Sequence, residues 1–91
     1  MIASFRNRET ERVFNRISDR KLGVIQGRAE EKLAVLNAAT QLLDLSLPSL
    51  RLEKLTGDRK GQYSIRINGQ FRICFAWQDG NAYEVEIVDY H

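Results

Sequence analysis

The side chains best suited to chemistry are two arginines in the last third of the chain, Arg66 and Arg72, and the closing pair Tyr90 and His91. Cleavage of RNA by its own 2′-hydroxyl needs a base, cations that stabilise the charge on the phosphate, and an acid for the leaving 5′-oxygen. Guanidinium groups bind phosphate bidentately. His91, the only histidine, titrates in the range that acid–base catalysis uses, and Tyr90 could stack on a base or donate a proton. These residues could therefore cut RNA, although His91 could equally be a frayed terminal residue.

Basic residues are concentrated in the middle of the sequence. Residues 51–72 contain six basic side chains against two acidic ones, whereas residues 79–91 contain four acidic ones and neither Lys nor Arg. The formal net charge of the whole chain is only +2. A basic middle segment suits contact with phosphate. The alternative is that these charges only keep one face of a sheet in contact with water.

Several other classes of protein are excluded by missing motifs. The chain has no P-loop, dinucleotide fingerprint or nucleophile elbow. No Cys and His have the spacing of metal ligands, so we expect neither a metal nor another cofactor. Cys74, the only cysteine, could pair with His91 as a nucleophile, or it could be a small side chain that fills space on a strand. No apolar run could span a bilayer and Met1–Arg6 lacks the apolar segment of a signal peptide, which predicts a cytoplasmic protein with no membrane partner.

In the first half of the chain, the apolar residues have the spacing that is typical of helices. Asn7 can cap a helix whose buried stripe is Val13, Phe14 and Ile17. Gly23 interrupts the pattern, and a second helix is predicted over roughly Ile25–Ala39. Its buried face is expected to hold Ala29, Leu33 and Leu36. A short strand is predicted before these helices, over Ile2–Phe5.

After Pro48 the apolar residues recur at every second position, which predicts four antiparallel strands. A three-residue loop, Asn68–Gln70, pairs Ile67 with Phe71 and keeps the large apolar residues on one face. The last strand is expected to add its own apolar residues to that face. The apolar side chains are Tyr63, Ile65, Ile67, Phe71, Ile73, Phe75, Trp77, Tyr83, Val85 and Ile87. The opposite face then carries Ser64, Arg66, Arg72, Cys74 and Ala76, and is expected to be open, polar and basic.

Together these patterns predict one domain, residues 1–91, of the α+β class. Two N-terminal helices should pack on one face of a twisted, mainly antiparallel sheet of about five strands. Arg66 and Arg72 should then lie near each other on the uncovered face, close to the end of the chain.

Three motifs carry a resemblance to a known family. They are Leu-x-Gly-Asp-Arg-x-Gly over residues 55–61, Ser-Ile-Arg-Ile-Asn over residues 64–68, and the terminal Asp-Tyr-His of residues 89–91. At these spacings, essentially the whole chain resembles the HigB-type toxins of the RelE/ParE superfamily, which belong to bacterial type II toxin–antitoxin systems. The resemblance implies the RelE-like fold of microbial ribonucleases.

The resemblance also implies an activity and partners. Such toxins enter the ribosomal A site and cleave messenger RNA without a metal. A HigA-type antitoxin with a helix-turn-helix domain neutralises them, and the toxin reaches operator DNA only through that antitoxin. By resemblance, Arg72 and Arg66 match basic strand positions of the family, and Asp89, Tyr90 and His91 match its C-terminal active-site cluster. We therefore predict Arg72, Asp89, Tyr90, His91 and Glu53 as catalytic residues. The predicted RNA-binding residues are Arg66 and, from the basic segment, Lys54, Arg59 and Lys60.

The sequence departs from the family at two positions. Some members carry His and Lys where this chain has Glu53 and Thr56, and Lys54 is the basic group nearest in sequence. Glu53 could act as the base in place of the missing histidine, or it could be a surface residue. Two other functions therefore stay open: a toxin of the same fold that acts on DNA gyrase, and a catalytically weak module that only binds its partner.

Overall fold

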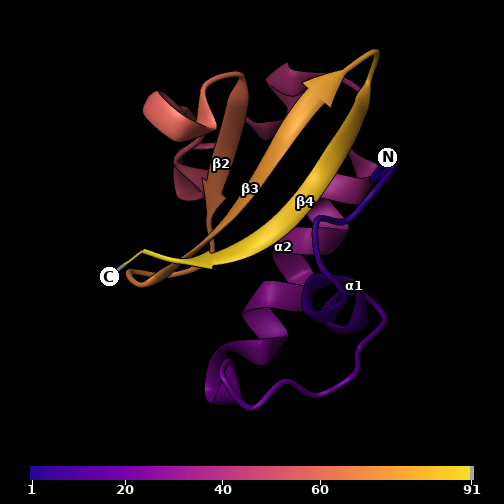
Figure 1. Cartoon of the computed structure of the whole chain (residues 1–91), viewed down its shortest axis with the longest axis vertical. Helices are drawn as coiled ribbons and strands as arrows, with labels where there is room; N and C mark the ends of the chain where they lie inside the picture. Colours follow the sequence, from indigo (N-terminus) through magenta and orange to yellow (C-terminus); the bar gives the residue numbers. More distant parts are fainter. Residues whose placement is uncertain (91) are drawn as a thin grey trace.

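The computed structural model describes residues 1–90, which form two layers. Helices α1 (Arg8–Phe14) and α2 (Gln26–Ala38) lie against a sheet of four antiparallel strands in the order β1-β2-β3-β4. The strands are β1 (Glu53–Lys54), β2 (Gln62–Arg66), β3 (Phe71–Gln78) and β4 (Asn81–Asp89). Figure 1 shows α2 passing behind β4, with the N-terminus on one side of the sheet and the end of β4 on the other. None of the helices within residues 1–90 is long and apolar enough to cross a membrane.

Helix α1 begins as its sequence predicts. The Asn7 side chain accepts a hydrogen bond from the Thr10 backbone N–H at 2.9 Å, and the Thr10 hydroxyl accepts one from the Ile87 N–H at 3.0 Å, which ties the helix to β4. Val13 is buried as expected. Ile17 is 41% exposed, so its predicted place in the buried stripe was wrong. The helix ends at Phe14 and Arg16 adopts a left-handed φ of 64°, which turns the chain before Ile17 can continue the stripe.

Helix α2 supplies the helical side of the core. Ala29, Leu33 and Leu36 are fully buried, which confirms the predicted face. They belong to one apolar cluster with residues of all the longer strands, among them Ile65, Ile73, Phe75 and Val85. Burial of such side chains is the main stabilising contribution in a domain of this size.

The predicted first strand forms only in part. Ile2 and Phe5 make isolated parallel bridges to Ala82 and Val85, so the structure has four regular strands where about five were expected. A bulge in β4 accounts for the interruption. Glu84 has a φ of 53° and its N–H donates to the hydroxyl of Ser4 at 2.9 Å, which separates the two bridges.

The loop between β2 and β3 has the predicted register. Arg66 pairs with Arg72, and the Ile67 N–H donates to the Phe71 carbonyl at 3.0 Å. The Asn68 side chain accepts hydrogen bonds from the backbone of Gln70 and Phe71, at 2.9 and 2.7 Å. The three-residue loop Asn68–Gln70 is therefore confirmed.

The bulge in β4 changes which side chains enter the core. Cys74 pairs with Glu86 and Ala76 pairs with Tyr83, so two residues of β4 face one residue of β3. Tyr83 consequently shares the polar face with Ala76, and Ala82 is buried in the core instead. The prediction for Tyr83 was wrong because alternation in a sequence does not reveal an inserted bulge residue.

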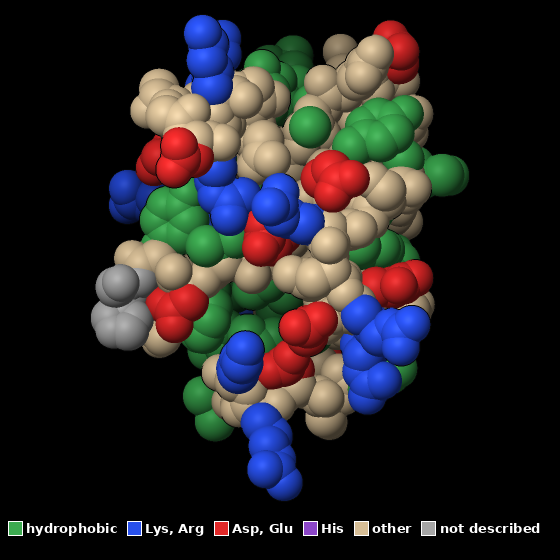
Figure 2. Space-filling view, in the orientation of Figure 1, with side chains coloured by type: hydrophobic (Ala, Val, Ile, Leu, Met, Phe, Trp, Pro, Cys, Tyr) green, Lys and Arg blue, Asp and Glu red, His purple; other side chains and the backbone are tan. Residues whose placement is uncertain are grey.

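The polar face is covered at its centre. Ser64 and Cys74 are fully buried and Arg72 is 9% exposed, so the expectation of an open face holds only at its margins. The Arg59 guanidinium reaches over this face from the turn before β2 and binds Glu86 at 3.0 Å. Figure 2 shows basic and acidic side chains interspersed over the visible surface, without a continuous basic field.

Candidate active site

A pocket of about 360 Å³ opens on the polar face, beside the loop that joins β2 to β3. β1, β2, β3 and the residue after β4 all contribute side chains to it. The pocket is lined by Arg51, Glu53, Arg66, Asn68, Gly69, Arg72 and Tyr90. It thus combines four of the residues singled out by sequence, Glu53, Arg66, Arg72 and Tyr90.

Arg72 is fixed in place by three hydrogen bonds. Its Nε donates to the Ser64 hydroxyl at 2.8 Å, and its Nη2 donates to the carbonyls of Arg51 at 2.6 Å and Ser64 at 3.3 Å. Within residues 1–90, Nη1 has no hydrogen-bond partner. One edge of the guanidinium is therefore held by the protein, and the remaining donors can meet a ligand in the pocket.

Two further arginines are placed to bind an anion beside Arg72. Arg66 is its cross-strand partner, and Arg51 lies at the end of the short 3-10 helix Pro48–Leu50. Neither side chain makes a hydrogen bond or ion pair with another residue of the described chain. Because a guanidinium without a protein partner keeps all its donors, both can bind phosphate oxygens.

Arg51 was not among the residues predicted to act. It adopts the left-handed conformation, with φ 45° and ψ 52°, and its carbonyl accepts the shortest hydrogen bond of Arg72. The only signal in the sequence was its membership of the basic segment 51–72. A left-handed conformation at a residue other than Gly, Asn or Asp is uncommon and cannot be anticipated from residue type.

Glu53 and Lys54 point to opposite sides of the sheet. Glu53 pairs with Ser64 and lies on the polar face, where its Oε1 is 3.8 Å from Nη2 of Arg72. Lys54 pairs with Tyr63, on the side of the helices. The structure thus brings Glu53 to the pocket and places Lys54 away from it.

Tyr90 lies at the rim of the pocket as the last described residue. Its N–H donates to the Gln70 carbonyl at 2.6 Å, and its hydroxyl is 3.8 Å from Sγ of Cys74. Partial burial, together with the Cys74 contact, raises the pKa of Tyr90 above its ordinary value. The phenol is therefore protonated at neutral pH and can donate a proton.

Cys74 has the properties of a structural residue. It is fully buried, and burial raises the pKa of its thiol. A neutral thiol is a poor nucleophile, which favours the interpretation of Cys74 as a small strand residue.

The side chains of Asp89 and Tyr90 lie on opposite sides of the sheet and line different cavities. Asp89 pairs with Phe71 at the end of β4, accepts a hydrogen bond from the Gln70 side chain at 3.1 Å, and lines a separate cavity. The structure therefore does not bring Asp89 into the pocket with Arg72. His91, the other predicted catalytic residue of the tail, lies outside the described residues.

Arg59 and Lys60 do not line the pocket. Arg59 binds Glu86, and it also donates to the Gln62 side chain at 3.1 Å. It therefore shares the Glu86 carboxylate with Arg6, whose Nε lies 3.6 Å from the same oxygen. Lys60 is exposed in the turn that precedes β2.

The pocket can bind an anion and supply a proton. Three arginines face one glutamate around it, so its charge is positive overall. Among residues 1–90, no three Asp, Glu, His or Cys side chains are grouped so that they could hold a metal ion. Fixed cations beside a protonated phenol are groups that stabilise a phosphate and protonate its leaving oxygen.

Comparisons with known proteins give one consistent result. A family model described as the RelE-like toxin of type II toxin–antitoxin system HigB matches residues 3–91. Endoribonuclease HigB of Proteus vulgaris is 31% identical over an alignment that spans all of both chains. Toxin HigB-1 of Vibrio cholerae serotype O1 is 44% identical over 59 residues, which cover 64% of this chain and 62% of that protein.

One solved structure shows the same fold. The YoeB–YefM complex from Staphylococcus aureus contains a chain that aligns with a TM-score of 0.61 at 19% identity. The match covers 100% of this chain and 98% of the other.

Proposed function

Since this chain belongs to the HigB-like family of RelE-like toxins from type II toxin–antitoxin systems, we propose that it is an endoribonuclease that cleaves messenger RNA in the ribosomal A site. The observation that carries the proposal is the fixed guanidinium of Arg72, which lies in one pocket with Arg66, Arg51 and the protonated Tyr90. The name of the Proteus vulgaris relative, an endoribonuclease, supports the same activity.

The proposed reaction is attack of an RNA 2′-oxygen on the adjacent phosphorus. The bond from phosphorus to the 5′-oxygen breaks, and a 2′,3′-cyclic phosphate remains on the upstream fragment. Arg72, Arg66 and Arg51 bind the phosphate oxygens and stabilise the added charge. Tyr90 gives its proton to the departing 5′-oxygen, and the Glu53 carboxylate accepts the proton of the 2′-hydroxyl.

We also propose the setting in which the toxin acts. Its partner is a HigA-type antitoxin with a helix-turn-helix domain, and operator DNA is contacted only through that antitoxin. The YoeB chain of similar fold was solved in a complex with YefM, which supports a protein partner. Action on ribosomes places the protein in the cytoplasm.

Brief expression followed by primer extension tests the activity. New 5′ ends should arise within coding sequence, and purified chain should cleave messenger RNA only when ribosomes are present. Arg66→Ala should reduce cleavage about tenfold or more, because one phosphate ligand is lost without disturbing a contact within the fold. Arg28→Ala, an exposed arginine of α2, serves as the matched control and should cleave as the wild type does.

Other outcomes would favour the alternatives. A DNA-damage response with intact messengers would indicate action on gyrase. Harmless expression together with tight antitoxin binding would indicate a module that only binds its partner. Full cleavage by Arg66→Ala and by Arg72→Ala would show that the site lies elsewhere.

A further inference from the structure

Arg51 contributes more to the pocket of the candidate site than its side chain. We call that pocket, which Arg51, Arg66 and Arg72 line, the arginine pocket. Four residues other than glycine have a positive φ within residues 1–90, and Arg51 is the one among them that lines this pocket. The Cβ of an arginine crowds the backbone in the left-handed region, so the surrounding structure must stabilise the conformation.

The segments on both sides of Arg51 hold it in this conformation. Before it, the Arg51 N–H donates to the Pro48 carbonyl at 3.3 Å, and Leu50 is buried in the core. After it, Leu52 packs against the same core and Glu53 begins β1. Only two residues thus connect an anchored 3-10 helix to a strand, and a left-handed residue at a helix end makes such a change of direction in one step.

The left-handed backbone determines where the Arg51 carbonyl points. This carbonyl accepts from Nη2 of Arg72 at 2.6 Å, while the Ser64 hydroxyl accepts from Nε at 2.8 Å. Two acceptors on different nitrogens fix the plane of the guanidinium. A change of ψ at Arg51 to an ordinary region would turn the carbonyl away and leave Nη2 with its longer bond to the Ser64 carbonyl, at 3.3 Å.

The chemical nature of this acceptor suits a phosphate site. A carbonyl is neutral, so it orients Arg72 without forming an ion pair with it. The Glu53 carboxylate lies 3.8 Å from the same Nη2, which is beyond hydrogen-bond distance. The orientation of Arg72 therefore comes from the Arg51 backbone and from Ser64 rather than from a hydrogen-bonded acid.

We propose that Arg51 is a positioning residue for Arg72 through its left-handed backbone, independently of the guanidinium with which it binds phosphate. The proposal rests on the proposed function, because it concerns the rate of the same cleavage. It requires that loss of the side chain costs less rate than loss of the conformation. Glycine at this position should therefore preserve the rate better than a β-branched residue.

Three variants without a guanidinium separate the backbone from the side chain. Arg51→Gly, Arg51→Asn and Arg51→Val all remove the phosphate ligand, but glycine and asparagine adopt the left-handed region readily and valine does not. At saturating ribosome concentration, single-turnover cleavage by Arg51→Val should be about tenfold slower or more than by Arg51→Gly, with Arg51→Asn close to Arg51→Gly. The ribosome concentration that gives half the maximal rate should rise equally in all three, because all lose the same phosphate contact.

Arg16 is the matched control for backbone strain alone. It is an exposed arginine with a φ of 64°, and it does not line the arginine pocket. Arg16→Val should be less stable than Arg16→Gly in urea denaturation, as Arg51→Val should be relative to Arg51→Gly. Both Arg16 variants should nevertheless cleave at the wild-type rate.

A second background tests whether Arg51 acts through Arg72. In Arg72→Ala, the residual rates with Arg51→Gly and with Arg51→Val should be equal, because the group that the carbonyl positions is gone. Equal rates for folded Arg51→Gly and Arg51→Val in the otherwise unchanged chain would overturn the proposal. A difference between them that persists in Arg72→Ala would overturn it as well.

The order of the Arg72 guanidinium can be measured without any activity, so the two proposals fail separately. Exchange of its Nε–H with water, followed by NMR, should be slow in the wild type and in Arg51→Gly and faster in Arg51→Val. A chain that shows this pattern but leaves messenger RNA intact on ribosomes would contradict the endoribonuclease function alone. A chain that cleaves messenger RNA, with equal exchange and equal rates in the two variants, would contradict the positioning role alone.

Discussion

At the scale of single residues, the site combines one fixed arginine with two free ones. Ser64 and the Arg51 carbonyl hold Arg72 on one edge. Arg66 and Arg51 keep their donors for a ligand. A fixed donor needs no reorganisation when charge develops on the phosphate, which is the condition for strong transition-state stabilisation. Ser64 therefore acts as a positioning residue for Arg72.

Ser64→Ala should lower kcat about tenfold or more, because the Arg72 guanidinium loses its Nε acceptor and can rotate. The measurement is single-turnover cleavage on purified ribosomes, with thermal unfolding to establish the folded fraction. In an Arg72→Ala background the same substitution should have no further effect on cleavage. An equal loss in both backgrounds would show that Ser64 contributes only to stability.

Tyr90→Phe should reduce cleavage about 100-fold, because the proton donor is removed while the ring remains. Burial and the Cys74 contact raise the pKa of Tyr90 above its ordinary value of 10.0, so the wild-type phenol keeps its proton and Tyr90 causes no loss of rate between about pH 7 and pH 9. Rates measured across that range check both points. A Phe variant that cleaves at the wild-type rate would assign the acid to another group.

Part of the site could be predicted from the sequence. The requirement that apolar residues share one face fixed the loop Asn68–Gln70, and that register placed Arg66 beside Arg72. The alternation of a strand already separates Asp89 from Tyr90, although the family motif groups them. Arg51 could not be found, because its role depends on a left-handed backbone and on a carbonyl that reaches Arg72 from another segment.

At the scale of elements, turns and bulges decide where the predictions succeed. Helix α2 and the β2–β3 hairpin follow their apolar periods closely. The bulge at Glu84 shifts the early part of β4 by one residue and limits the N-terminal segment to two bridges. The residue types do not reveal either effect, because Glu does not favour a positive φ.

Two glycines give opposite expectations for substitution by alanine. Gly80 has a φ of 80°, and an added Cβ would lie 3.0 Å from the Thr40 carbonyl oxygen. Gly80→Ala should therefore lower the free energy of unfolding by about 1–2 kcal/mol. Gly27 lies in α2 with nothing within 4 Å of the added atom, so Gly27→Ala should raise it by about 0.5–1 kcal/mol. Urea denaturation measures both, and a stabilised Gly80→Ala variant would contradict the description of this turn.

Asp44 makes the stability of the 3-10 helix Leu42–Leu45 depend on pH. Hydrogen bonds from the backbone of Thr40 and Gln41 hold the pKa of its carboxyl below the ordinary value. A lowered pKa in the folded state means that the contribution is fully present above the unfolded pKa and is lost as the pH falls through the folded one.

The melting temperature of Asp44→Asn should therefore lie below that of the wild type at neutral pH. The difference should shrink as the pH is lowered below about 4. Asp58→Asn, an exposed acid in another 3-10 turn, is the control. A difference that stays constant down to about pH 2 would exclude the carboxylate as its source.

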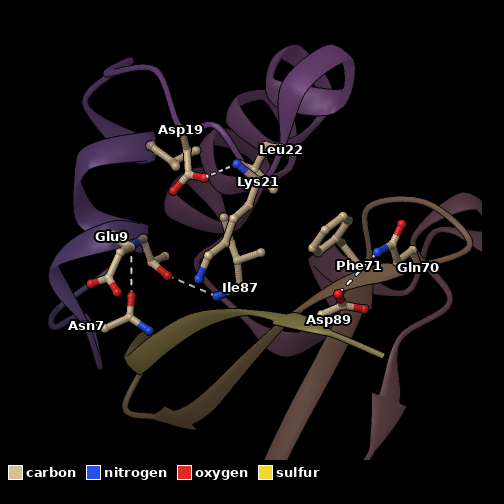
Figure 3. A pocket seen from close by; sticks show the side chains of 11 residues that line it. Asn7, Glu9, Asp19, Lys21, Leu22, Gln70, Phe71, Ile87 and Asp89 are labelled. Atoms are coloured by element: carbon tan, nitrogen blue, oxygen red, sulfur yellow. Dashed lines mark hydrogen bonds between the residues drawn. The ribbon is translucent and has the colours of Figure 1, made fainter. Parts of the chain in front are cut away.

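At the scale of the whole molecule, charge is divided between two pockets rather than spread as a basic surface. Arg51, Arg66 and Arg72 line the pocket of the candidate site, and Arg59 forms an ion pair with Glu86 on the same face. Glu9, Asp19 and Asp89 are among the residues that line a second cavity, between α1 and the end of β4 (Figure 3). Single-stranded RNA should thus be held through few phosphates.

The salt dependence of RNA binding measures that number. With about three phosphate contacts, the logarithm of the affinity should fall with the logarithm of salt concentration with a slope of about −2. Arg66→Ala should make the slope shallower by about 0.7. Fluorescence anisotropy with a short labelled RNA gives both values, and a much steeper wild-type slope would indicate a basic surface that includes Lys60.

Cys74, the only cysteine of the chain, is fully buried beneath the polar face, and its Sγ lies 3.8 Å from the Tyr90 hydroxyl. A thiol reagent can reach this atom only when the sheet opens locally. The rate at which the native protein is alkylated would therefore report local opening beside the arginine pocket without an introduced label.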